Sequence, residues 1–134
     1  MIGRRRLDPV AKLALTLRIW RTAVRVRRGT AHEPLPGYVE RLGSVEPTAD
    51  PIDPRLLARA VDRCLRIGHV RPRCLINALV LYRLLHEQGA PAELVIGLPP
   101  EAADQSAHAW VELDGYDIGP APGRNGHEPM ARFG

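Results

Sequence analysis

Apolar residues recur at helical spacing near the start of the chain. The first helical segment runs from about Pro9 to Arg27, where Asp8 can cap the helix and Pro9 suits its first position. Gly29 is expected to end it. Its predicted buried stripe has members three or four residues apart: Val10, Leu13, Leu17, Trp20 and Val24. We expect this stripe to pack on the rest of the domain, with a partner protein or a membrane surface as the alternative.

A proline-rich stretch separates this helix from a second one. Residues 29–52 are predicted to be a crossing loop with a short helical turn at Tyr38–Leu42. Asp53 and Pro54 then repeat the cap-and-proline signal of a helix start. The second helix is expected to end at Gly68. Its predicted buried stripe comprises Leu57, Ala60, Val61 and Cys64.

A third helix is predicted between Pro72 and Gly89, with Cys74 in its first turn. Apolar residues occur on more than one face of this helix, unlike the single stripe of a surface helix. We therefore expect it to be the central and most buried helix of the domain.

The residues after this helix change to patterns typical of strands. Residues 93–98 are predicted to form a buried strand, and 107–113 a second one. Asp114 and Gly115 form a two-residue hairpin turn before a return strand over 116–119. The tail from Pro120 is expected to be irregular. The order of elements predicts an α+β fold, with the central cysteine-bearing helix packed on a small antiparallel sheet.

Charge changes this picture only at the front of the chain. With 134 residues the chain is expected to be a single soluble domain. Residues 1–28 carry nine basic side chains and one acid, whereas the rest of the chain has a net charge of −4. A basic front segment can bind nucleic acid, an acidic membrane surface or an acidic partner. A solvated helix face explains the charge equally well.

The cysteine count and the first apolar segment bear on the compartment. Two cysteines cannot build a disulfide framework, and no secretory signal precedes them. Arg18, Arg21 and Arg25 interrupt the first apolar segment, so we expect no transmembrane segment. The simplest expectation is a cytoplasmic protein with free thiols.

Cys74 is the candidate nucleophile. A thiol attacks as the thiolate, which a helix N-terminus and nearby positive charge both favour, and Arg71 and Arg73 are its neighbours in sequence. Backbone amides at the helix start could also hold the oxyanion of a tetrahedral intermediate. The alternative role is that of a small buried hydrophobe, which is the role we expect for Cys64.

His108 is the candidate base. It opens a predicted strand beneath the helix start, from where its imidazole could take a thiol proton, and alternation places it on one face with Trp110 and Glu112. A partly buried surface histidine is the alternative. Cys64, His69 and Cys74 lack the close pairing of metal ligands, so we expect neither a metal nor a cofactor.

Several motifs in order resemble one known family. They are Arg73-Cys74-Leu75, the helix ended by Gly89, the strand at 94–97, and the run His-Ala-Trp-Val-Glu at 108–112 followed by Asp114-Gly115. In this order they resemble the transglutaminase-like cysteine proteases, and most nearly the leader peptidases of lasso-peptide biosynthesis. The resemblance covers residues 55–120 well and the N-terminal helices loosely.

The resemblance implies a papain-like site. Cys74 would attack the scissile carbonyl, and His108 would activate the thiol and then protonate the leaving amine. The family's third residue is an aspartate on the return strand, but Pro120 stands where we would expect it. Asp117 is the best available candidate, although it lies about 13 Å along the strand from the level of His108 unless a bulge shifts the register. A dyad with a backbone or water orienter is the alternative.

The resemblance also implies partners. The substrate would be a precursor peptide, and a separate winged-helix leader-binding protein and the cyclising synthetase would be partners, with no nucleic acid. Residues 1–52 would then be a docking segment for a partner or leader, and residues 53–134 the protease core. A transglutaminase-like acyltransferase and a non-catalytic peptide-binding domain remain alternatives. Nucleic-acid binding through residues 1–28 ranks last, because the rest of the chain is net acidic.

Overall fold

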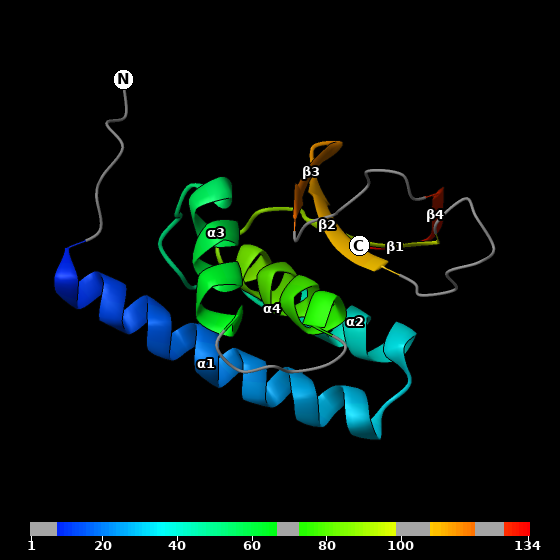
Figure 1. Ribbon diagram of the computed structural model, residues 1–134, viewed down its shortest axis with the longest axis horizontal. Helices are drawn as coiled ribbons and strands as arrows, with labels where there is room; N and C mark the ends of the chain where they lie inside the picture. The colour runs from blue at the N-terminus through cyan, green and yellow to red at the C-terminus, as the bar shows by residue number, and fades with distance from the viewer. Residues whose placement is uncertain (1–7, 67–72, 99–107, 120–127) are drawn as a thin grey trace.

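The computed structural model describes residues 8–66, 73–98, 108–119 and 128–134. These ranges contain four helices and one four-stranded sheet (Figure 1). In chain order the elements are α1 (Pro9–His32), α2 (Leu35–Gly43), α3 (Pro54–Leu65), α4 (Arg73–Glu87), β1 (Glu93–Leu98), β2 (His108–Leu113), β3 (Tyr116–Gly119) and β4 (Glu128–Phe133). The α+β fold class predicted from the sequence is confirmed.

The sheet is antiparallel throughout, with the strand order β3-β2-β1-β4. The turn between β2 and β3 is the predicted two-residue hairpin, since both Asp114 (φ 53°) and Gly115 (φ 82°) have positive φ. The prediction of an irregular tail is wrong for residues 128–133, because β4 pairs with β1 there. Only Ala131 and Phe133 in β4 are partly buried, so its sequence lacks a strong strand pattern.

Helix α4 is the central element, as predicted. It packs against β1 and β2 on one side and against the other three helices elsewhere, and Figure 1 shows it between α1 and the sheet. Because it is enclosed in this way, it contributes apolar side chains to the core on several faces. Its buried apolar residues are Ile76, Ala78, Leu79, Val80, Leu81, Tyr82, Leu84 and Leu85.

Helix α1 packs on α4 through a different face from the predicted one. Its inward stripe consists of Leu15, Ile19, Thr22, Ala23 and Val26, all buried. The predicted stripe Val10, Leu13, Leu17, Trp20 and Val24, here called the outward stripe, is exposed. An α-helix turns about 100° per residue, so Ile19 and Leu17 point in nearly opposite directions. The prediction that the outward stripe packs on the domain is therefore wrong.

The predicted end of α1 is also wrong, because the helix continues through Gly29 to His32. A Cβ at Gly29 would collide with the ring of Tyr38, so a glycine is needed where α2 crosses α1. The Tyr38 hydroxyl donates a hydrogen bond of 3.2 Å to the Arg25 carbonyl oxygen. The crossing-loop prediction is corrected in the same place, since α2 is a full helix and not a single turn.

Helix α3 begins as predicted. Asp53 caps it by accepting a hydrogen bond of 3.1 Å from the Arg55 amide. Leu57 and Val61 are buried, while Ala60 and Cys64 are half-buried. The predicted end at Gly68 lies outside the described residues. Within the described ranges, no helix is both long and apolar enough to cross a membrane.

Candidate active site

Cys74 is the second residue of α4, and its side chain is half-buried. The first turn of a helix leaves backbone N–H groups without intrahelical acceptors and carries a partial positive charge. The first turn of α4 contains no acidic residue that would offset this charge. Both cysteines are free thiols. Cys74 therefore lies beside backbone amides that could hold an oxyanion, whereas Cys64 lies near the C-terminal end of α3. The side chains of Arg71 and Arg73 lie outside the described part.

His108 is the first residue of β2, half-buried and paired with Gly97 of β1. A short connection returns the chain from the end of α4 to Glu93, so β1 runs back along the helix. Gly97 and His108 accordingly belong to the end of the sheet that faces the beginning of α4. Figure 1 shows the N-terminal end of α4 and the start of β2 on the same side of the molecule.

The alternation of β2 places His108 on a particular face of the sheet. Ala109 and Val111 belong to the same core cluster as the buried residues of α4. Successive side chains of a strand point to opposite faces, so His108 shares the other face with Trp110 and Glu112. An imidazole on that face meets the Cys74 thiol only around the end of the sheet.

A buried carboxylate stabilises the strand that carries His108. Glu112 is only 4% exposed and accepts a hydrogen bond of 2.9 Å from the Trp110 indole N–H. Its other oxygen accepts a hydrogen bond of 2.9 Å from the Arg132 guanidinium on β4. This bond to Glu112 raises the pKa of Arg132. The network connects β2 to the far edge of the sheet across β1.

Arg132 was missed by the sequence reasoning. The available signal was Glu112 itself, because a carboxylate in a buried strand requires a cation or hydrogen-bond donors. The same face carries a second packing constraint, at Gly97. A Cβ there would lie 2.6 Å from the Trp110 ring, so only glycine lets the indole cover β1 beside His108.

Asp117 lies on β3 directly opposite Glu112, in the predicted register. A register shift between Val111 and Glu112 pairs Val111 with Gly119, so the irregularity falls after Asp117. Asp117 therefore stays four residues, about 13 Å, from the level of His108 along the sheet. Its side chain is exposed and accepts a hydrogen bond of 2.8 Å from the Gly119 amide. Pro120 lies outside the described residues.

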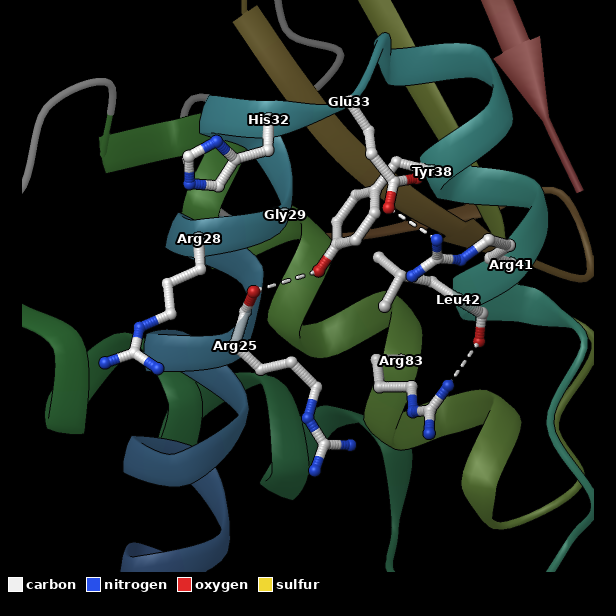
Figure 2. Close-up of a pocket in the computed structure, with 9 residues that line it drawn as sticks. All are labelled: Arg25, Arg28, Gly29, His32, Glu33, Tyr38, Arg41, Leu42 and Arg83. Carbon is white, nitrogen blue, oxygen red and sulfur yellow. Dashed lines mark hydrogen bonds and ion pairs between the residues drawn. The ribbon is translucent and has the colours of Figure 1, made fainter.

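The described ranges contain no group of three His, Cys, Asp or Glu residues that could hold a metal ion. They do contain a cavity of about 410 Å³ between α1, α2 and α4 (Figure 2). Cys74, His108 and Asp117 do not line it. Its walls are instead rich in arginine, with Arg25, Arg28, Arg41 and Arg83 among the lining residues.

Comparison with known protein families gives a match over most of the chain. The family model of the transglutaminase-like superfamily matches residues 11–131, which is most of the chain. This superfamily includes cysteine peptidases and acyltransferases. No curated protein and no solved structure matches the chain significantly.

Proposed function

The chain belongs to the transglutaminase-like superfamily, and we propose that it is a cysteine peptidase with Cys74 as nucleophile and His108 as general base. Its reaction would remove the leader from a ribosomally made precursor peptide, as in lasso-peptide maturation. The observation that carries the proposal is the position of Cys74 in the first turn of α4, a helix packed on the strand that begins with His108.

The chemistry follows from these two groups. His108 takes the proton from the Cys74 thiol, and the thiolate sulfur bonds to the scissile carbonyl carbon. The negative charge moves to the carbonyl oxygen, which the free backbone amides at the start of α4 can stabilise. Collapse of this intermediate breaks the C–N bond, and the imidazolium gives its proton to the leaving amine. His108 then deprotonates a water molecule that attacks the thioester, which releases the acid and restores the thiol.

The imidazole of His108 needs a third group to orient it. Asp117 is the proposed third residue, and its support is the shared sheet face and the match to the return strand of the family. The separation of about 13 Å along the sheet weighs against direct contact with His108. A Cys-His dyad oriented by a backbone carbonyl or a water molecule would perform the same steps.

The proposed partners follow from the resemblance to leader peptidases. A precursor peptide would be the substrate, presented by a separate winged-helix leader-binding protein, and the cyclising synthetase would use the released core. The described part of this chain lacks a helix that could span a membrane. We therefore propose to test the enzyme in solution together with the leader-binding protein.

The experiment is cleavage of a lasso-type precursor peptide in the presence of the leader-binding protein, followed by mass spectrometry. The enzyme, Cys74→Ser and Cys64→Ser would be compared. We expect Cys64→Ser to cleave like the unaltered chain. We expect Cys74→Ser to lose at least about a thousandfold in rate, as is usual when a covalent nucleophile is removed. Equal loss in both variants, or retained cleavage by Cys74→Ser, would contradict the assignment.

The same assay separates hydrolysis from acyl transfer. Both reactions begin with the same thioester, and they differ in what attacks it. With methylamine added, a peptidase yields mainly a leader with a free carboxylate. A leader ending mainly in the methylamide would instead identify an acyltransferase.

A further inference from the structure

The outward stripe of α1 has the spacing of a helix-packing seam. Its five members are separated by three, four, three and four residues, which is the pattern of alternating a and d positions in a heptad repeat. All five side chains are exposed, although α1 already buries its inward stripe against α4. Figure 1 shows α1 along the outer side of the molecule.

We propose that the outward stripe is a docking site for an acidic amphipathic helix of a partner protein. The stripe extends from Val10 to Val24, which is about 21 Å along the helix axis. Arg27 takes the next seam position and ends the apolar surface. A strict a/d seam is narrow and fits one helix, whereas binding to a membrane surface uses a wider apolar face.

The arginines beside the outward stripe favour an acidic partner helix. Arg21 and Arg28 occupy the e positions beside the seam, where charged residues contact a partner helix. In the part of the chain that the structure describes, neither side chain forms an ion pair, in contrast to Arg18, which pairs with Glu87 at 2.9 Å. Acidic residues at the facing positions of the partner would complement this edge.

The cavity between α1, α2 and α4 extends the positive edge. Arg25 and Arg28 line it together with Arg41 and Arg83, and Glu33 is its single acidic lining residue (Figure 2). Arg41 is paired with Glu33, and Arg83 is paired with Glu87. The positive charge beside the C-terminal half of the seam therefore comes mainly from Arg25 and Arg28, and the partner's acidic side chains would concentrate there.

A second copy of this chain fits the face poorly. Helix α1 contains no acidic residue between Pro9 and His32. Two copies packed through their outward stripes would therefore place arginines with no carboxylate between the helices. In an antiparallel pair the e-position arginines of the two helices would face each other, and like charges there disfavour the pair. A partner with its own acidic helix removes this conflict.

The test uses a three-heptad synthetic peptide with leucine at its a and d positions and glutamate at e and g. Its twin, with lysine in place of glutamate, is the matched control. Binding to the intact protein is followed by calorimetry and by the emission of Trp20, which should shift to the blue as the exposed indole is covered. We expect the acidic peptide to bind at least about tenfold more tightly than the basic one.

Two double variants locate the contact. Leu13→Ser with Leu17→Ser should weaken binding at least about tenfold, because both side chains lie in the middle of the seam. Arg21→Gln with Arg28→Gln should weaken binding less and reduce its dependence on salt. Met130→Ser, which changes an exposed apolar residue on β4, should have no effect. The double variant Leu13→Ser with Leu17→Ser should keep the thermal unfolding midpoint of the unaltered protein. A loss of binding in this variant would then not come from unfolding.

The proposal would be overturned by equal binding of the two peptides, by no binding of either, or by unchanged binding in the Leu13→Ser, Leu17→Ser double variant. A membrane surface or a second copy of the chain as the occupant of the outward stripe would each give a different result. Binding to vesicles of anionic phosphatidylglycerol in place of the acidic peptide would make the face a membrane contact. A dimer that forms in solution and is abolished in the Leu13→Ser, Leu17→Ser double variant would make the outward stripe a self-association surface. The proposal uses no residue of the Cys74–His108 site, so it and the peptidase assignment can fail independently.

Discussion

Helices α1 and α4 are both apolar on more than one face, yet they lie in different surroundings. Helix α4 is enclosed by the sheet and three helices, so its extra apolar side chains are buried. Helix α1 lies at the periphery and buries only its inward stripe. The comparison shows that a second apolar face is buried in a central helix but stays exposed in a peripheral one. The number of neighbouring elements decides between these two outcomes.

The largest expected effect is in the enclosed helix. Leu79 is fully buried in α4, and Leu79→Ala removes its side chain where the surroundings cannot collapse freely. We expect the free energy of unfolding to fall by about 3–4 kcal/mol. Urea denaturation followed by circular dichroism measures this. A loss below about 1 kcal/mol would mean that α4 is not the packed centre.

The two faces of α1 provide the next test, with substitutions only two residues apart. Ile19 is 0% exposed and Leu17 is 57% exposed. We expect Ile19→Ala to lower the free energy of unfolding by about 2–3 kcal/mol, and Leu17→Ala by less than about 0.5 kcal/mol. Equal losses, measured by the same denaturation assay, would contradict the orientation of α1.

A third substitution tests the face of the sheet turned away from α4. Arg132→Ala removes the guanidinium that donates a hydrogen bond to the buried Glu112 carboxylate, and we expect the free energy of unfolding to fall. In a Glu112→Gln background the same substitution should cost less, because the carboxylate charge that faces Arg132 is absent. If the double variant is less stable by the full sum of both single effects, the two side chains do not interact.

A smaller effect is expected at high pH. Burial raises the pKa of both Tyr38, which packs under α1, and Tyr82 of α4. The folded protein therefore holds these protons to a higher pH than the unfolded chain does. The contribution of the protonated tyrosines to the free energy of unfolding is fully present below the tyrosine pKa of the unfolded chain, about 10. As the pH rises above that pKa the contribution is lost, by at most about 1.4 kcal/mol per pH unit for each tyrosine. Denaturation between pH 8 and 11 should show this decline, reduced in Tyr82→Phe.

Local signals explain why the strands and helix starts could be predicted. Asp114 and Gly115 specify a hairpin turn by themselves, and Asp53 with Pro54 marks a helix start. The inward face of α1 could not be predicted in the same way, because Leu15, Ile19 and Val26 have helical spacing as good as that of the outward stripe. Packing on α4, nearly 60 residues away in sequence, decides between them.

In the candidate site, too, some residues could be predicted from local signals and others depend on contacts distant in sequence. Cys74 and His108 could be proposed from their positions at the start of a helix and of a strand. Arg132 could not, because it pairs with a carboxylate 20 residues earlier in the chain and lies in a strand that the sequence pattern did not indicate. Contacts between strands depend on the sheet order, which no local pattern contains.

The central claim is that Cys74 is an activated nucleophile and Cys64 is not. The most direct test is the rate at which iodoacetamide labels each cysteine between pH 5 and 9, resolved by peptide mass spectrometry in the intact protein and in His108→Ala. We expect Cys74 to be labelled much faster than Cys64, and we expect this difference to be lost in His108→Ala. Slow labelling of both cysteines, unchanged in His108→Ala, would contradict the claim.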